Sequence, residues 1–172
     1  QAHHDAVRSA LAYLESDILR SQTMTKNGHD FIDIDKSIVA QFTHTTNRNK
    51  EPHLHTHNVV MNAGATQDEQ WRSVFSNNIY DNQLLLGMIY QSELAERCKD
   101  LGYNPIWNNE KGMFELAELN KSDLRAFSQR RVEIEKFAEE HGISSAADME
   151  KAALNTRDIK HDIPTDEVIQ GW

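Results

Sequence analysis

The chain has 172 residues, 38% of them hydrophobic, and a formal net charge of −9 at pH 7. This length and composition predict one ordinary domain with a buried core and exclude an intrinsically disordered chain. The negative charge excludes a protein that coats nucleic acid through overall positive charge. No apolar run approaches the roughly 20 residues of a membrane span, and the opening "QAHHDAVRSA" is neither a secretory signal nor a translation start. We therefore expect no membrane insertion, and a chain cut from a longer protein.

Hydrophobic spacing predicts the elements of the first half. Apolar residues recur at helical spacing over residues 5–20, which predicts an amphipathic helix that the polar stretch 21–30 ends. Residues 31–45 and 53–63 are predicted to be extended chain, because side chains of one kind recur at every second position and so fall on one face of a strand. We expect these two strands to pair as an antiparallel hairpin across "TTNRNKEP".

The second half begins with an apolar stripe that predicts a helix over 82–101, with Gly102 as its stop. Residues 103–116 then predict a β-hairpin. Ser122 can cap a long helix that ends at Gly142, and short helices with polar connections follow.

These elements predict an α+β fold. A sheet-containing part over residues 1–120 precedes a helical C-terminal part over 121–172, with the seam near Lys121. Cys98 is the one cysteine of the chain, which excludes an internal disulfide and fits a reducing cytoplasm. Its place in the predicted 82–101 helix indicates packing and not a reactive thiol.

Four of the nine histidines fall within the fourteen residues 44–57, where composition alone predicts about 0.7. His55 and His57 share a strand face, and a register that sets one of them opposite His44 leaves the other at the diagonal position. Three imidazoles then converge, a donor set that suits Zn, Ni, Cu or Mn better than Mg or Ca and leaves positions open for a substrate oxygen. His53 lies on the same face, so spacing leaves open which three bind. The alternative is a set of half-buried strand histidines with ordinary hydrogen bonds.

The stretch "FTHTTNRNKEPHLHTHNVVMNAG" resembles the histidine motif of the MobF class of conjugative relaxases, the TraI- and TrwC-like relaxase-helicases with an HUH motif. "HHDAVRSALAYLE", "IYQSELAERCKDLGY", "LRAFSQRRVEIEK" and "NTRDIKHDIPTDEVIQGW" resemble successive segments of the same domain. The resemblance covers nearly the whole chain, residues 1–172, as one relaxase domain whose antiparallel sheet carries the histidine triad between helices. It implies that the metal ligands are His44, His55 and His57, and that His53 faces the substrate or supports the ligands.

Relaxases of this class use a tyrosine near their N-terminus as nucleophile and an acidic residue from another upstream segment. Neither segment is recognisable in this sequence. Tyr13, Tyr80, Tyr90 and Tyr103 lie in segments that resemble helices or their ends, where packing or surface roles explain them. The resemblance therefore implies a fragment that lacks its nucleophile and is inactive alone.

The implied activity is metal-dependent, site- and strand-specific nicking and rejoining of DNA at a plasmid origin of transfer during bacterial conjugation. The cofactor would be a divalent ion, Mn, Zn, Mg or Ni. Single-stranded origin DNA, relaxosome accessory proteins and a conjugative coupling protein would be the partners, in the bacterial cytoplasm.

Cationic and aromatic residues supply candidate DNA contacts. Arg48 can hold a phosphate beside the histidines, although a solvated loop arginine is the alternative. The arginines of the predicted C-terminal helix can contact the DNA backbone, although ion pairing with Glu133 or Glu135 is the alternative. Three aromatic residues can stack on bases, although core packing is the alternative. The arginines are Arg125, Arg130 and Arg131, and the aromatic residues are Trp71, Trp107 and Phe127.

Two other functions stay open. Without its nucleophile the chain can be a metal-dependent single-stranded-DNA-binding module. A weaker alternative is an unrelated histidine-metal hydrolase that activates water, but no general base stands at a telling spacing.

Overall fold

The computed structural model describes residues 1–47, 49–108, 112–143, 145 and 148. The chain divides into two compact units. The first holds residues 1–43 and 56–118, and the second holds 44–55 and 119–172. Within the described ranges no helix is both long and apolar enough to cross a membrane.

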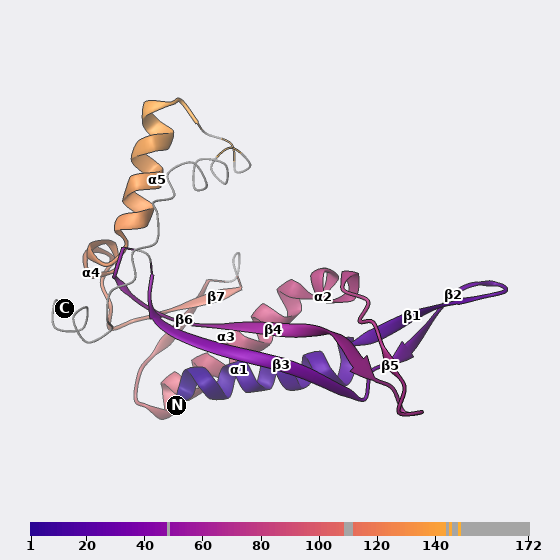
Figure 1. The fold of residues 1–172 in the computed structure, drawn as a ribbon. Helices are drawn as coiled ribbons and strands as arrows, with labels where there is room; N and C mark the ends of the chain where they lie inside the picture. Colours follow the sequence, from indigo (N-terminus) through magenta and orange to yellow (C-terminus); the bar gives the residue numbers. More distant parts are fainter. Residues whose placement is uncertain (48, 109–111, 144, 146–147, 149–172) are drawn as a thin grey trace. The chain divides into compact units, whose positions relative to one another are not determined.

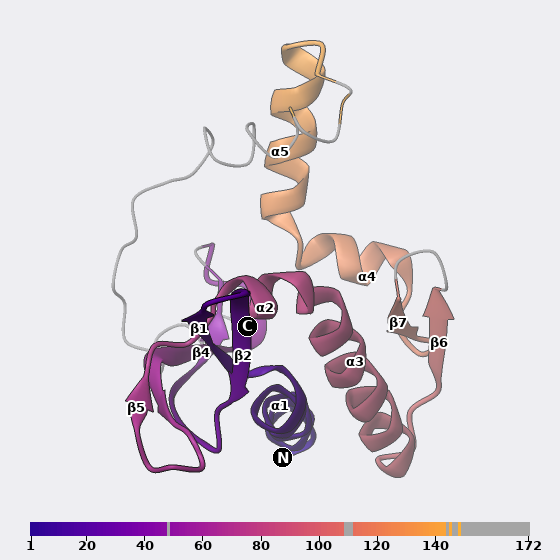
Figure 2. The same ribbon diagram turned by 90° about the vertical axis from the view of Figure 1, so that its right-hand side faces the viewer.

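Two helices dominate the first unit. Helix α1 (Ala2–Tyr13) continues into one π-helical turn, η1 (Leu14–Ile18), and helix α3 (Gln83–Asp100) follows the short α2 (Asn77–Asp81). Figures 1 and 2 show α1 and α3 lying side by side. The expected 5–20 and 82–101 helices are therefore confirmed, with shifted ends. Gly102 ends α3 in the left-handed region (φ +90°), as predicted.

The strands of the described chain form three sheets. Strands β3 (Lys36–Thr46) and β4 (Pro52–Ala65) are neighbours, and the short β5 (Trp71–Arg72) pairs with the end of β4 (Figure 1). Strands β6 (Pro105–Asn108) and β7 (Met113–Leu116) form the predicted C-terminal hairpin. The α+β prediction is confirmed.

The prediction for residues 21–30 is wrong. This stretch forms a hairpin of β1 (Arg20–Thr25) and β2 (Gly28–Asp33) and not a polar connection. Its side chains show no apolar face, since Ser21 is buried while Met24 and Phe31 are exposed. Backbone pairing across the Lys26–Asn27 turn holds it, and side-chain periodicity does not report such pairing.

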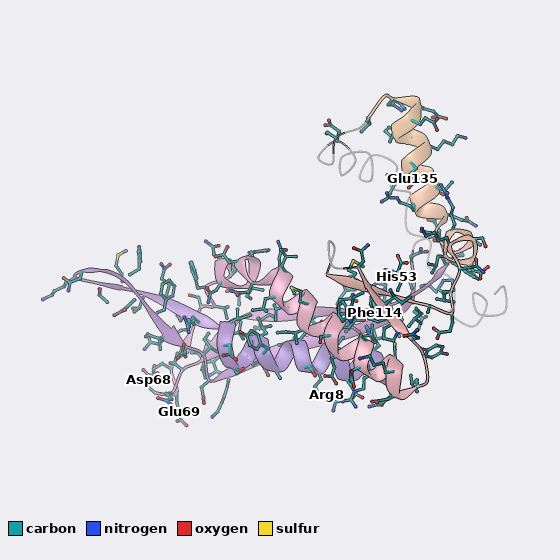
Figure 3. All side chains as sticks on the ribbon, turned by 180° about the vertical axis from the view of Figure 1, so that it is seen from behind. Arg8, His53, Asp68, Glu69, Phe114 and Glu135 are labelled. Atoms are coloured by element: carbon teal, nitrogen blue, oxygen red, sulfur yellow. The ribbon has the colours of Figure 1, made fainter. Side chains whose placement is uncertain are left out.

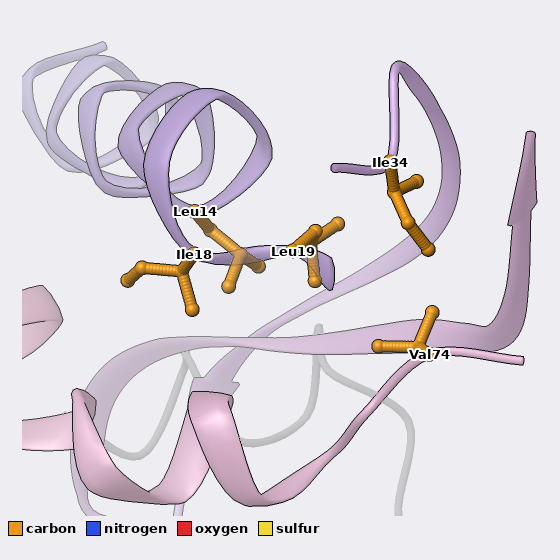
Figure 4. Close-up of a cluster of buried hydrophobic side chains, with 5 residues drawn as sticks. All are labelled: Leu14, Ile18, Leu19, Ile34 and Val74. Atoms are coloured by element: carbon orange, nitrogen blue, oxygen red, sulfur yellow. The ribbon is translucent and has the colours of Figure 1, made fainter. Parts of the chain in front are cut away.

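The core of the first unit gathers where α1 ends. The π-turn bond from Leu19 N to Leu14 O (3.0 Å) turns the chain, and residues from three segments meet there. Burying each of these aliphatic side chains contributes about 1.5–3 kcal/mol. The cluster consists of Leu14, Ile18, Leu19, Ile34 and Val74 (Figure 4).

Gly64 of β4 is buried against this core. A Cβ there would lie 2.3 Å from Ile34 Cγ2 and 3.0 Å from the backbone oxygen of Lys36. Gly64→Ala is therefore expected to lower the free energy of unfolding by about 1–3 kcal/mol through overpacking. Urea denaturation measures the change.

Gly87→Ala in α3 is the matched control, because a Cβ there meets open space. The helix should gain up to about 1 kcal/mol from the better helix former. Equal effects of the two substitutions would contradict the packing argument at Gly64.

The second unit carries the helices of the C-terminal part. Here the single long helix predicted from Ser122 to Gly142 is wrong, because α4 (Lys121–Ala126) and α5 (Gln129–Glu140) are separate. Ser128 between them has a non-helical backbone (φ −133°, ψ 44°). The first cap is Asn120, whose side chain accepts a hydrogen bond from Asp123 N, and not Ser122. The short helices expected after Gly142 lie largely outside the described residues.

Candidate metal and DNA site

The register of the β3–β4 hairpin is visible from two side-chain pairs in the first unit. Thr43 Oγ1 lies 3.0 Å from Thr56 Oγ1, and Gln41 Nε2 donates to Asn58 Oδ1 at 3.0 Å. Both pairs fit one antiparallel register, in which His57 lies opposite Phe42. The predicted hairpin across "TTNRNKEP" is confirmed.

On the threonine face of this hairpin, Thr56 is bonded by a residue of α1. His3 is buried, and its ring nitrogens bond Tyr90 Oη (2.9 Å) and Thr56 Oγ1 (2.8 Å). Burial raises the pKa of Tyr90. The polar chain from Tyr90 through His3 to Thr56 and Thr43 joins α3, α1 and both strands.

The opposite face carries His57 and is open to solvent. Phe42, Val59 and Met61 alternate along this face, and each is at least half exposed. His57 is exposed as well. The exposure of this face allows a substrate to approach the histidines.

His44 and His55 meet in the second unit. Their ring centroids are 5.3 Å apart, and His53 stacks on His55 at 4.7 Å. His55 Nδ1 lies 2.8 Å from the backbone oxygen of His53. Because a carbonyl can only accept, Nδ1 carries the proton and Nε2 carries the lone pair. A carbonyl that orients a ligand imidazole in this way is common at metal sites.

The donor chemistry of this pair fits a divalent transition metal. Two imidazoles on one tetrahedral ion, with bonds of about 2.0–2.1 Å, have ring centroids about 5 Å apart, close to the distance between His44 and His55. In the part of the chain that the structure describes, no three His, Cys, Asp or Glu side chains are already grouped to hold a metal. The structure thus brings two of the predicted ligands together, and the assignment of the three-histidine set stays a prediction.

The predicted cationic residues are only partly described. Arg48 lies outside the described residues, and so does the side chain of Arg130. Arg131 Nε donates to Glu135 Oε1 at 2.6 Å, and Arg125 Nη2 donates to Glu135 Oε2 at 3.3 Å (Figure 3 labels Glu135 on α5). The Arg131 hydrogen bond, with the charges of Arg131 and Arg125, lowers the pKa of Glu135. Both arginines therefore form ion pairs with Glu135, which the sequence analysis gave as the alternative to DNA contact.

The three candidate stacking residues are exposed. Trp71 is 59%, Trp107 42% and Phe127 55% accessible, so core packing is wrong for them. Trp107 lies beside Phe114, with ring centroids 5.8 Å apart. Exposed aromatic rings are the side chains on which bases of single strands stack.

The four tyrosines and Cys98 lie in or beside helices, as the sequence predicted. Tyr13 ends α1, while Tyr80 and Tyr90 lie within α2 and α3 and Tyr103 follows α3. Cys98 is a partly buried residue of α3, and burial raises the pKa of its thiol. A protonated thiol is a poor nucleophile, in agreement with a packing role.

Sequence reasoning missed two residues of this region. His3 has no periodic signal that distinguishes it from a surface histidine of α1. Glu51, buried in the hairpin loop, reads in the sequence as one more exposed acid. Both are recognised only by burial and by their hydrogen bonds to distant residues.

Comparison with known proteins agrees with these features. The TrwC relaxase family model matches residues 1–172. The multifunctional conjugation protein TraI of Escherichia coli is 31% identical over 180 residues, which cover 99% of this chain but only 10% of TraI. The chain therefore spans about a tenth of this curated relative.

Two solved structures of the conjugative relaxase TrwC with oriT DNA have the same fold. The metal-free complex superposes with a TM-score of 0.90 and the metal-bound complex with 0.89. Each is 26% identical, and the match covers 99% of this chain and 61% and 60% of the two relaxase chains. The family model matches all 172 residues, the antiparallel hairpin carries the histidines, and the fold agrees with that of the two relaxase structures. The chain therefore belongs to the TrwC relaxase family.

Proposed function

We propose that this chain is the histidine-bearing part of a relaxase that nicks and rejoins one DNA strand at an origin of transfer during conjugation. The observation that carries the proposal is the His44–His55 pair, with His55 Nδ1 fixed by the His53 carbonyl, in a chain of the TrwC relaxase family. The relatives named above are a conjugation protein and a relaxase complexed with oriT DNA.

The proposed ligands are His44, His55 and His57. His57 follows His55 by two residues on β4, so strand alternation directs both to one face. A divalent ion held there, for which Mn, Zn, Ni and Mg are candidates, would neutralise charge that grows on the scissile phosphate. The metal-bound TrwC structure supports the use of a metal in the family. His53, stacked on His55, supports the ligand ring and faces the substrate.

The proposed reaction is a transesterification. A tyrosine hydroxyl attacks the scissile phosphorus, the bond to the 3′ oxygen breaks, and a 5′-phosphotyrosine and a free 3′-hydroxyl result. Because one ester replaces another, the 3′-hydroxyl can attack in return and rejoin the strand. Tyr13, Tyr80 and Tyr90 lie in helices and Tyr103 follows α3, and these positions favour a nucleophile outside these 172 residues.

The same tyrosine positions favour a second candidate function. In this second function, the chain alone binds metal and single-stranded DNA without cutting the strand. The accessory and coupling proteins of conjugation are then partners of the complete relaxase. One experiment separates the two functions. The chain and the full-length protein are each incubated with Mn²⁺ and a labelled oligonucleotide that contains the origin of transfer.

We expect a covalent DNA adduct with the full-length protein and DNA retention without a nick with the chain. An adduct mapped to Tyr13, Tyr80, Tyr90 or Tyr103 would overturn the assignment of the nucleophile. Hydrolysis without any adduct would replace the relaxase with the metal-hydrolase alternative.

The proposed DNA path includes the start of α5 and the end of α4. Arg125→Ala, Arg130→Ala and Arg131→Ala should each weaken single-stranded DNA binding about equally across sequences. Each should also lower the slope of log affinity against log salt by roughly 0.7 for the lost phosphate contact. Binding curves at several salt concentrations measure the slope.

Arg97→Ala is the matched control. Arg97 is an arginine of α3 that pairs with Glu93 at 2.8 Å, so its loss removes a cation from a comparable ion pair. The control should keep the wild-type slope. If the α4 and α5 variants also keep it, the DNA path does not include these arginines, and Arg125 and Arg131 serve only their bonds to Glu135.

A further inference from the structure

Glu51 is a buried acid in the loop that joins β3 to β4. Only 6% of its surface is exposed, and it lies four residues before His55. Burying a carboxylate costs free energy unless hydrogen bonds replace the lost water. The contacts of Glu51 therefore indicate which parts of the second unit this acid holds together.

One set of contacts closes the loop on itself. The Asn47 amide Nδ2 donates to Glu51 Oε2, and Asn47 Oδ1 accepts from Glu51 N at 3.0 Å and from Asn49 N at 2.9 Å. Asn47 N also donates to Glu51 O at 3.1 Å. Lys50 adopts the left-handed backbone region that the tight turn requires (φ 62°). Asn47 and Glu51 thus fix the ends of the strands that carry His44 and His55.

A second set of contacts reaches across 78 residues to α5. Gln129 N, the first backbone N–H of that helix, donates to Glu51 Oε1. Asn49 Nδ2 donates to Glu133 Oε1 at 3.1 Å, one turn further along. A carboxylate at a helix N-terminus is favoured by the helix dipole and satisfies an otherwise unpaired N–H.

We propose that Glu51 is a positioning residue for the histidine pair, and that it acts by tying the histidine loop to the N-terminus of α5. The inference rests on the proposed metal site. It makes α5 part of the scaffold of that site, because one carboxylate bonds both the loop asparagine and the helix. The start of α5 then influences metal affinity without contacting the metal.

The test measures Mn²⁺ affinity by calorimetry in the full-length protein. Glu51→Ala removes both bonds and should weaken binding about 10- to 100-fold, the usual effect of losing a group that orients a ligand. Glu51→Gln keeps an oxygen that can accept the Gln129 N–H, so it should restore part of the affinity. Glu139→Gln, on an exposed acid of α5, is the matched control and should bind Mn²⁺ as the wild type does.

A role limited to stability is tested by two further readouts. Far-UV circular dichroism reports whether each variant is folded, and cleavage kinetics should show a lower kcat with an unchanged KM for DNA. Wild-type Mn²⁺ affinity in folded Glu51→Ala would overturn the proposal. If that variant does not fold, Glu51→Asp decides in the same way, because it keeps the charge but draws the carboxylate back from Gln129 N by one methylene group. Reduced affinity in Glu51→Asp supports the proposal, and wild-type affinity overturns it.

His55→Ala in the same titration separates the two levels of the argument. If His55→Ala binds Mn²⁺ as the wild type does, the proposed metal site has failed, and the positioning role of Glu51 fails with it. If His55→Ala loses Mn²⁺ while folded Glu51→Ala keeps it, only the inference about Glu51 is overturned.

Discussion

His55→Ala is expected to weaken Mn²⁺ or Zn²⁺ binding by at least about 100-fold, more than the loss of a group that merely orients a ligand. The reason is that His55 presents its Nε2 lone pair next to His44, with Nδ1 held by the backbone. His57→Ala should have a similar effect. Calorimetric titration measures the affinities, and circular dichroism should show an intact fold, because neither ring belongs to the buried core.

His53→Ala is the matched control for this titration. The variant loses an imidazole of the same strand that stacks on His55. It keeps the backbone carbonyl of residue 53, which still orients Nδ1 of His55. The expected loss is smaller than for His55→Ala. A larger loss in His53→Ala, or unchanged affinity in His55→Ala, would show that the ligand set is wrong.

His44→Ala in the full-length relaxase is expected to lower kcat for cleavage by about 100- to 1,000-fold, the effect of losing one group that stabilises transition-state charge. Affinity for the origin oligonucleotide should change far less, because the charge on the phosphate grows mainly in the transition state. Single-turnover cleavage and equilibrium binding with the same oligonucleotide give the two quantities.

Thr45→Ala provides the control, since it alters the neighbouring exposed residue of β3 and leaves the imidazoles in place. It should cleave as the wild type does. If His44→Ala loses DNA binding and cleavage by the same factor, the residue holds the ground state of the DNA, and the proposed catalytic role is wrong.

Local patterns predicted the elements whose side chains repeat with a clear period. The stripe over residues 82–101 became α3, and the alternation around His-x-His became β4, because one face of each carries a distinct set of side chains. The same alternation predicted that His55 and His57 share a face. The sequence left open whether His55 or His57 lies opposite His44. The Gln41–Asn58 and Thr43–Thr56 pairs of the folded hairpin select the register, which sets His57 opposite Phe42.

Patterns failed where the backbone itself decides the structure. The β1–β2 hairpin has no buried apolar face, so its strands gave no period to detect. The break between α4 and α5 lies at Phe127 and Ser128, neither of which is a strong helix breaker. Tertiary contacts at the start of α5 compete there with local helix propensity, which is a weak preference.

The sequence by itself determined the α+β class, the histidine hairpin and the family, because short-range periodicity and a dense motif carry that information. Only the tertiary structure decided which charged and polar residues support the site. His3 bonds Thr56 across 53 positions, and Glu51 bonds the first N–H of α5 across 78. The physical reason is that burial gives such groups their importance. A carboxylate or imidazole that looks solvated in the sequence must find specific partners once folding removes its water, and chain folding chooses those partners at distances that no local pattern encodes.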